Sequence, residues 1–206
     1  MQIDKTNTRA FRGSAYRFPE KIKQKGLILN RHKPRKPIGR KGKEMAILTI
    51  RTDSDPILSK VCRPVEEITP RILTLLDDMV DTMRKAEGVG LAGPQVGVLR
   101  RIVVVECTPG EVYVLINPVI TERDGVQLGK EGCLSLPGQC GIVSRPMNVT
   151  VEATNRKGER FTVTGSGLLA RAFCHELDHL DGKLYPQVAQ RMLTYEEMMK
   201  ASEEQS

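Results

Sequence analysis

The sequence predicts an α+β protein in which antiparallel β-sheets pack around a central helix that carries an HExxH motif. Two pairs of β-branched segments each flank a short turn, which is typical of β-hairpins. Two longer stretches have helical patterns, and the second of them contains the motif. The hydrophobic fraction of 39% over 206 residues is ordinary for a globular protein and provides for one domain with its own core.

The first helix is predicted to begin at Pro70, because proline suits the first turn of a helix. Gly88 can end it. The apolar residues that recur at helical spacing on one face are Ile72, Leu76, Met79 and Met83, with Leu73 and Val80 beside them. The pattern predicts a helix that packs on the core.

Two hairpins are predicted from the β-branched segments. The first pair, residues 101–106 and 111–116, is separated by a Thr-Pro-Gly turn. The second pair, residues 148–154 and 159–164, flanks an Arg-Lys-Gly turn. Strands that are joined by such short connections pair antiparallel.

A second long helix is predicted from Leu168 to Leu180, where good helix formers run without Gly or Pro. Gly182 can close it. Near the end of the chain, Thr194 is followed three residues later by Glu197, which is the signature of a capping box and predicts a short exposed helix.

The first 44 residues differ in charge from the rest. They hold 14 Lys or Arg and 3 Asp or Glu, so the net charge of +7 for the chain leaves −4 for residues 45–206. We expect a basic, disordered extension over residues 1–44 and one catalytic domain over residues 45–206. The extension is interpreted either as a solvated tail or upstream start, since Met45 resembles a natural beginning, or as a contact with the ribosome or its RNA, although no RNA-binding motif is recognisable.

The expected location is the cytoplasm. No apolar run approaches the roughly 20 residues that a membrane span needs, and the N-terminus lacks the pattern of a secretory signal. Five cysteines at irregular spacing argue against a disulfide framework and for reduced thiols. They are Cys62, Cys107, Cys133, Cys140 and Cys174.

The sequence HELDH at residues 175–179 is an HExxH motif. Its spacing places the imidazoles of His175 and His179 on one face of the helix, where they can share a cation, with Glu176 beside them as a general base. The alternative is a pair of surface histidines without a function. Because the chain has only three histidines and two of them lie here, a metal site is favoured.

The motif alone does not identify a third ligand. Metalloproteases with HExxH usually add a Glu or His downstream, but no histidine follows here, and the available acids are Asp181, Glu196 and Glu197. Upstream, Cys133 lies in the Gly- and Pro-containing segment 131–137, which predicts a turn. A thiolate there could complete a Cys-His-His site with one position open for water, although a single cysteine is by default a small buried hydrophobe.

Three segments, in this order, resemble the hallmark motifs of the peptide deformylase family. They are GVGLAGPQ at residues 88–95, EGCLS at residues 131–135 and HELDH at residues 175–179. The resemblance runs from Met45 to about Met199 and leaves the basic extension outside it. It implies a metal-dependent enzyme that hydrolyses the formyl group from the N-terminal formylmethionine of nascent polypeptides, and it supports the α+β fold more strongly than periodicity does.

Four residues depart from the usual pattern of that family. Gly93 stands where Ala is usual and Ser166 where an acidic residue is frequent, and both are expected to affect packing or helix entry. Gly138 and Cys140 replace polar residues of some members just after the metal cysteine. How the peptide tail of the substrate is held there is therefore left open.

The resemblance also implies roles for single residues. Cys133, His175 and His179 would hold a divalent metal that lowers the pKa of a bound water. Glu176 would accept the proton of this water and later pass it to the departing amine. These assignments describe hydrolysis assisted by a metal.

By the same resemblance, the oxyanion would be stabilised by the side-chain amide of Gln95 and the backbone N–H of Leu134. For Gln95 the alternative is a structural amide that bridges two loops. The residues expected to bind substrate are Val89, Gly90, Gly132 and Leu168. Leu168 would line an apolar pocket for the methionine side chain, unless it is plain core.

The sequence does not decide which metal is bound, because one thiolate with two imidazoles suits Zn²⁺, Fe²⁺, Co²⁺ or Ni²⁺. The family typically uses ferrous iron, which predicts loss of activity in air. Two other functions stay open: a zinc endopeptidase, which the upstream thiolate disfavours, and a structural metal module that binds RNA through the extension. The latter needs a fourth ligand, for which only Cys174 is near.

Overall fold

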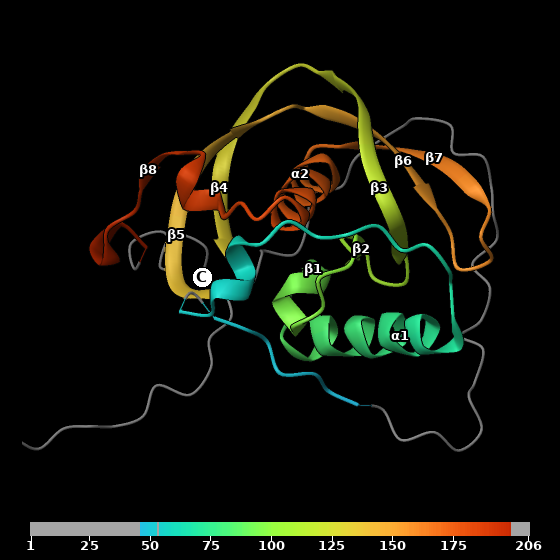
Figure 1. Cartoon of the computed structure of the whole chain (residues 1–206). Coiled ribbons are helices and arrows are strands. Elements are labelled where there is room, and N and C mark those ends of the chain that lie inside the picture. Colours follow the sequence, from blue (N-terminus) through green and yellow to red (C-terminus); the bar gives the residue numbers. More distant parts are fainter. Residues whose placement is uncertain (1–45, 53, 199–206) are drawn as a thin grey trace, which may run out of the picture.

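Two antiparallel sheets and two long helices form the fold, which agrees with the predicted α+β class (Figure 1). The computed structural model describes residues 46–52 and 54–198, so the predicted extension over residues 1–44 lies outside the described residues. The larger sheet has the strand order β1-β2-β3-β6-β7 and the smaller β4-β5-β8. The elements are α1 (Pro70–Lys85), α2 (Leu168–Leu180), β1 (Gly90–Ala92), β2 (Ile102–Val105), β3 (Tyr113–Asp124), β4 (Gln127–Cys133), β5 (Leu136–Arg145), β6 (Asn148–Thr154), β7 (Arg160–Ser166) and β8 (Ala189–Met192), with 3₁₀ turns at Pro56–Ser59, Gly93–Val96 and Tyr185–Gln187.

Helix α1 begins where the sequence predicts, with Pro70 in its first turn and the hydroxyl of Thr69 accepting a hydrogen bond from the Ile72 amide. Its end is a Schellman turn. The N–H of Gly88 donates to Met83, and the residue with positive φ is Glu87 (φ 55°). Gly88 therefore helps to end the helix through the hydrogen bond of its backbone N–H, whereas Glu87 adopts the left-handed conformation.

The two predicted hairpins are confirmed as the antiparallel pairs β2–β3 and β6–β7. Strand β3 continues well beyond the predicted segment, because the chain passes Asn117 and Pro118 in a bulge. Asn117 has a φ of 53°, and its side-chain amide exchanges two hydrogen bonds with the backbone of Val65. Side-chain bonding of this kind stabilises a conformation that few residues other than glycine adopt.

The smaller sheet was not predicted from the sequence. Strands β4 and β5 are interrupted by polar residues and glycines, and β8 is a short edge strand. The predicted turn at residues 131–137 is narrower than expected, because Cys133 ends β4 and pairs with Leu136 of β5. The glycine-rich segment 88–95 also contains strand β1, which pairs with β2.

Helix α2 has the predicted bounds and carries the HExxH motif. It contacts strands of both sheets, and Figure 1 shows it between β4 of the smaller sheet and β3 and β6 of the larger one. Gly182, with a φ of 70°, follows its end as predicted. Every residue from 170 to 177 is buried, so this helix lacks a solvent face along most of its length.

The end of the described chain confirms the predicted capping box. The Glu197 carboxylate accepts from the Thr194 amide, and the Thr194 hydroxyl accepts from the Glu197 amide. All five cysteines are free thiols, as predicted. Within the described ranges, the structure has no helix with the length and apolar character of a membrane span.

Candidate metal centre

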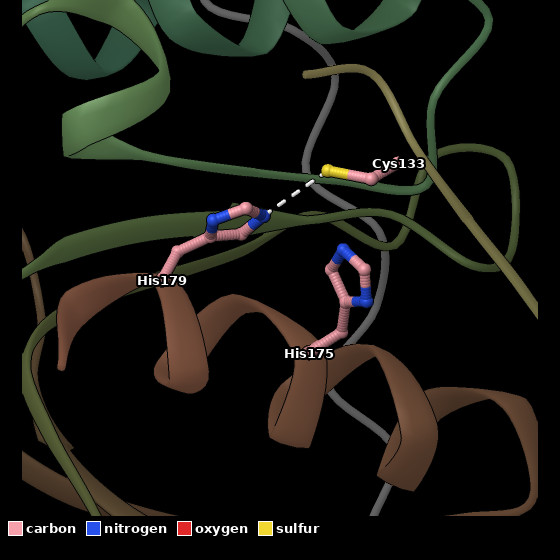
Figure 2. A group of neighbouring side chains, drawn as sticks. All are labelled: Cys133, His175 and His179. Carbon is pink, nitrogen blue, oxygen red and sulfur yellow. Dashed lines mark hydrogen bonds between the residues drawn. The ribbon is translucent and has the colours of Figure 1, made fainter. Parts of the chain in front are cut away.

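One sulfur and two imidazoles meet at the end of the β4–β5 hairpin. Cys133 lies at the end of β4, whereas His175 and His179 lie one turn apart on α2. One potential ligand atom from each residue lies within 4.8 Å of the other two, and the Cys133 Sγ and His179 Nε2 are 3.2 Å apart. Figure 2 shows the three side chains pointing toward a common space.

The donor set and spacing fit a bound cation. Three donors bound tetrahedrally to one ion at about 2.0–2.3 Å lie roughly 3.5 Å apart, and the separation of 3.2 Å between Cys133 Sγ and His179 Nε2 is close to this spacing. The site joins one thiolate to two nitrogens, which is the ligand chemistry of zinc and of late first-row transition metals. The Nδ1 atom of His179 is buried and has no hydrogen-bond partner, so its ring orientation rests on packing and on the contact with Cys133.

Four hydrogen bonds converge on the buried carboxylate of Glu131. Oε1 accepts from Arg145 Nε at 2.9 Å and from Arg171 Nη1 at 2.8 Å. Oε2 accepts from Arg145 Nη2 and from His175 Nδ1, both at 3.0 Å. Burial acts to raise the pKa of this carboxyl, but hydrogen bonds from His175 and Arg145 outweigh it and lower the pKa to about 2.

The state of Glu131 fixes the tautomer of His175. An ionised carboxylate can only accept hydrogen bonds, so His175 Nδ1 carries the proton of this contact. The lone pair of Nε2 is then available for a cation. The carboxylate thus prepares one ligand of the site without binding the metal itself.

Glu176 lies beside the two histidines and is buried. Its Oε2 atom has no hydrogen-bond partner, and burial raises the pKa of the carboxyl to about 7. The backbone of Gly90 passes so close that a Cβ there would lie 2.3 Å from Glu176 Oε1. Gly90 therefore gives the carboxylate its space, in addition to the contact with substrate that the resemblance implies.

Gln95 is buried, and its amide is held at both ends. Its Oε1 accepts from the Ala92 amide at 2.8 Å, so Nε2 faces Ser135 Oγ at 3.2 Å and Cys133 Sγ at 3.5 Å. The backbone contact leaves one choice for the oxygen, because an N–H can only donate. Gln95 thus bridges two segments, as the structural interpretation expects, and directs its donors toward the metal cysteine, as the resemblance implies.

The remaining predicted residues surround this group. Leu134 forms the hairpin turn next to Cys133, and its side chain packs against Gly88. Val89 is half-buried against the core. The position of a Cβ on Gly132 has no neighbour closer than 3.6 Å, which leaves room beside the site. Leu168, at the start of α2, is 38% exposed, so it is not a plain core residue.

The departures from the family pattern lie in different surroundings. Gly93 has no space for a side chain, because a Cβ would lie 2.7 Å from the carbonyl oxygens of both Val98 and Arg100. Ser166 and Gly138 are exposed, whereas Cys140 is buried. The effect of Gly138 and Cys140 on peptide binding stays a prediction.

Sequence reasoning did not find the charged residues behind the histidines. Arg145 binds both Glu131 and, at 2.7 Å, Asp178 of the HELDH motif, and Arg171 also binds Glu131. A signal was present at Arg171, because a charged residue lies four positions before His175 on a helix that is otherwise apolar there. The partners on β4 and β5 have no such signal, since they depend on the tertiary structure.

Comparison with known proteins gives a consistent result. A model of the polypeptide deformylase family matches residues 47–194. A peptide deformylase of Agathobacter rectalis is 53% identical over 156 residues, which is 74% of this chain and 98% of the relative. A peptide deformylase of Lachnoclostridium phytofermentans is 58% identical over 143 residues, 68% of this chain and 88% of the relative.

Solved structures agree with the sequence comparison. The crystal structure of a peptide deformylase from Legionella pneumophila superimposes with a TM-score of 0.68 and 41% identity, covering 78% of this chain and 94% of that one. The peptide deformylase of Thermotoga maritima has the same TM-score at 34% identity and covers 70% and 99% of the two chains. On its sequence, its fold and the matched residues, this chain belongs to the peptide deformylase family.

Proposed function

We propose that this protein is a metal-dependent hydrolase that removes the formyl group from the N-terminal formylmethionine of nascent polypeptides. The observation that carries the proposal is the convergence of Cys133, His175 and His179 beside a buried carboxylate, in a chain of the peptide deformylase family. The helix that presents both imidazoles lies between the two sheets, and we infer that this central position keeps the site rigid.

Cys133 Sγ, His175 Nε2 and His179 Nε2 would hold one divalent cation. When bound, the ion supplies a Lewis acid and makes water a strong nucleophile near neutral pH. Family membership favours Fe²⁺, while the ligand set also accepts Zn²⁺, Co²⁺ or Ni²⁺. Metal analysis of protein purified without oxygen decides among them.

Glu176 is assigned the transfer of protons. Its Oε2 has no partner in the described structure and is buried beside the two histidines, so it is available to a water or an amine in the site. It would accept a proton from the attacking water and deliver it to the departing amine nitrogen. Gly90 contributes by leaving room for this carboxylate.

Gln95 and Leu134 are assigned to the oxyanion that forms when water adds to the formyl carbon. The amide of Gln95 is oriented by Ala92, with its Nε2 toward Cys133, which suits a fixed donor beside the metal. The backbone N–H of Leu134 would be the second donor. A single donor of this kind is worth about 3 kcal/mol in the transition state.

The substrate is assigned to the open side of the site. The backbone of Val89 and Gly90, the free space at Gly132 and the exposed side chain of Leu168 would contact the formylated methionine. Leu168 is assigned to the pocket for the methionine side chain, because a half-exposed leucine at the start of α2 offers apolar surface.

Two other functions fit less well. An HExxH endopeptidase uses a third ligand downstream of the helix, whereas the third donor here is upstream and is a sulfur. A structural metal site needs four protein ligands, and within the described ranges only three donors gather with suitable spacing. Both observations favour a catalytic site with an open position.

The decisive assay is formate release from a formyl-Met peptide under anaerobic conditions, with and without a chelator. We expect release that the chelator abolishes and added Fe²⁺ or Co²⁺ restores. An unformylated peptide of the same sequence and an internally cleavable peptide serve as controls. Cleavage of an internal bond without formate release would identify an endopeptidase and refute the proposal.

The role of Glu176 is tested by Glu176→Gln, which keeps the size of the side chain but cannot accept a proton. We expect about 10²–10⁴-fold lower kcat. The metal content should be unchanged, because Glu176 is not among the three ligands. Wild-type activity in this variant would contradict the assigned proton transfer.

We further propose that residues 45–206 are sufficient for catalysis and that residues 1–44 form a separate basic extension, for which ribosome contact is one interpretation. Deletion of residues 1–44 should leave kcat/KM on a formyl-Met peptide within about twofold of the value for the full chain. Changes that do not touch the site usually have effects no larger than this. Cosedimentation of both forms with ribosomes at low and high salt tests the contact. Equal sedimentation of both forms would rule it out.

A further inference from the structure

We propose that Arg171 is a positioning residue of the metal site: its guanidinium, in a space that Gly129 leaves open, holds the carboxylate of Glu131 against His175. The inference depends on the proposed function for the identity of the site. It concerns, however, a residue that is neither a metal ligand nor in the proton-transfer machinery.

The carboxylate of Glu131 is shared between two residues of one helix face. Arg171 and His175 are separated by four positions on α2 and so lie one above the other. Both donate to Glu131, which lies on β4: Arg171 Nη1 to Oε1 at 2.8 Å and His175 Nδ1 to Oε2 at 3.0 Å. One carboxylate therefore fixes both the rotation of the helix against the strand and the ring of His175.

The carboxylate has no spare capacity. Two oxygens provide four lone-pair sites, and four donors occupy them, two from Arg145 and one each from Arg171 and His175. Without Arg171, Oε1 would keep a single donor in a place where water has little access, since Glu131 is 2% exposed. The carboxylate would then turn to recover a partner, and His175 would turn with it.

The guanidinium groups of Arg145 and Arg171 connect α2 to the smaller sheet at two different points. Arg145 lies on β5 and reaches α2 through Asp178, next to His179, at 2.7 Å. Arg171 belongs to α2 itself and reaches back to β5 through the carbonyl of Val143 at 3.1 Å. One attachment lies one turn before His175 and the other lies between His175 and His179, so both imidazoles have a fixed distance to the smaller sheet.

Gly129 explains how Arg171 can be buried in this position. A Cβ at residue 129 would lie 2.9 Å from Arg171 Nη2 and 3.3 Å from Cζ. A glycine in the middle of a strand weakens the strand. The close approach of the Arg171 guanidinium explains why residue 129 is nevertheless a glycine. The same group also points to the carbonyls of Gly129 and Gln127 at 3.5 and 3.4 Å.

The test uses the full-length protein loaded with Co²⁺, whose visible absorption reports the ligand geometry. Variants are Arg171→Lys, Arg171→Met and the control Arg101→Met, which removes an arginine that binds Asp181 after the end of α2 and does not contact Glu131. The readouts are the Co²⁺ spectrum, the rate of metal loss to a chelator, kcat and KM separately, and the thermal midpoint.

We expect Arg171→Met to lose Co²⁺ about 10–100-fold faster than wild type and to have an altered spectrum, with a lower kcat and little change in KM. Arg171→Lys should recover part of the metal retention, because one ammonium can replace the contact with Glu131 but not those with the carbonyls. Arg101→Met should lower the thermal midpoint without changing the rate of metal loss.

Gly129→Ala gives an independent variant if Arg171→Met does not fold. It should speed metal loss when Arg171 is present, because the clash is with the guanidinium. Where Arg171→Met does fold, adding Gly129→Ala to it should change the rate of metal loss little. Wild-type rates of metal loss and wild-type spectra in Arg171→Lys and Gly129→Ala would overturn the proposal. Absence of formate release by the wild-type protein would refute the proposed function alone, since metal retention is measured without substrate.

Discussion

The two long helices differ in what holds them in place. Helix α1 buries apolar side chains on one face, chiefly Leu76, Met79 and Met83, and none of its charged residues is fully buried. Helix α2 is buried almost all round and includes ionisable side chains among its buried residues, which are Arg171, His175, Glu176 and His179. Burial of apolar area stabilises α1 whichever apolar side chains it contacts. Each buried polar group of α2, in contrast, needs a specific hydrogen-bond or ion-pair partner.

This contrast has a functional meaning. A helix that depends on apolar packing tolerates changes of partner as long as volume is kept. A helix that buries charges costs stability unless every group is paired, and such helices are retained where the charges perform chemistry. We therefore expect substitutions around α2 to affect activity first and substitutions around α1 to affect stability first.

The largest expected effect is that of Gly90→Ala on activity. The added Cβ would lie 2.3 Å from Glu176 Oε1 and must displace this carboxylate. We expect kcat for formate release to fall about 10²–10⁴-fold with the metal still bound, because proton transfer is lost. The control is Gly165→Ala. Its added Cβ crowds Leu169 and Phe173, which belong to α2 but are not part of the site. Equal losses of kcat in both variants would mean that the effect is general strain on α2.

Next in size is the effect of Leu76→Ala on stability. Leu76 is a fully buried residue on the core face of α1, so its truncation to alanine removes apolar contacts and leaves a cavity. The free energy of unfolding should fall by about 2–5 kcal/mol, measured by urea denaturation. The kcat of the protein that stays folded should match wild type. A large loss of kcat without loss of stability would show that α1 and the site are coupled, which would contradict the division of roles between the two helices.

The smallest expected effect concerns pH and the pair of Arg84 on α1 with Glu106 after β2. The hydrogen bond from Arg84 lowers the pKa of the Glu106 carboxyl below the ordinary value of 4.5. A carboxyl with a lowered folded-state pKa stabilises the fold above pH 4.5, and this contribution disappears as the pH falls through the folded-state value. Arg84 is 49% exposed at its side chain, so the pair is worth at most about 1 kcal/mol.

Glu106→Gln should therefore lower the free energy of unfolding at pH 7 by less than about 1 kcal/mol, and the difference should shrink as the pH is lowered toward 3. Denaturation curves at both pH values measure this. Arg84→Gln should give the same pattern, because it removes the other partner. A loss that is larger at pH 3 than at pH 7 would contradict the sign derived from the lowered pKa.

Local patterns predicted several elements well. Helix α1 follows from its apolar repeat and from Pro70 in its first turn, and α2 has the predicted bounds. The hairpins β2–β3 and β6–β7 follow from β-branched segments around short turns. In each case the signal lies within about 20 residues of chain, where local preferences act.

The smaller sheet could not be predicted in this way. Strands β4 and β5 contain Gly129, Gly132, Gly138 and Gly141, which weaken any local preference for strand, and the surroundings of two of them explain why glycine stands there. Gly129 leaves space for Arg171, and a Cβ on Gly141 would crowd Tyr185 and Met192. Strand formation here depends on neighbours that are far away in the sequence.

By itself, the sequence determined the family, the ligand types and the helix that carries two of them, because HExxH spacing and the EGCLS segment are local. Only the tertiary structure decided that Cys133 meets both imidazoles, that Glu131 is shared by His175 and two arginines, and that Gly90 makes room for Glu176. Apart from the contact of Glu131 with Arg145 on the neighbouring strand, these contacts join residues 40 or more positions apart, and no local preference encodes such distances. They arise when the hairpin of β4 and β5 packs on α2, and the buried charges of Glu131, Arg145 and Arg171 then select the arrangement in which each of these three has a partner.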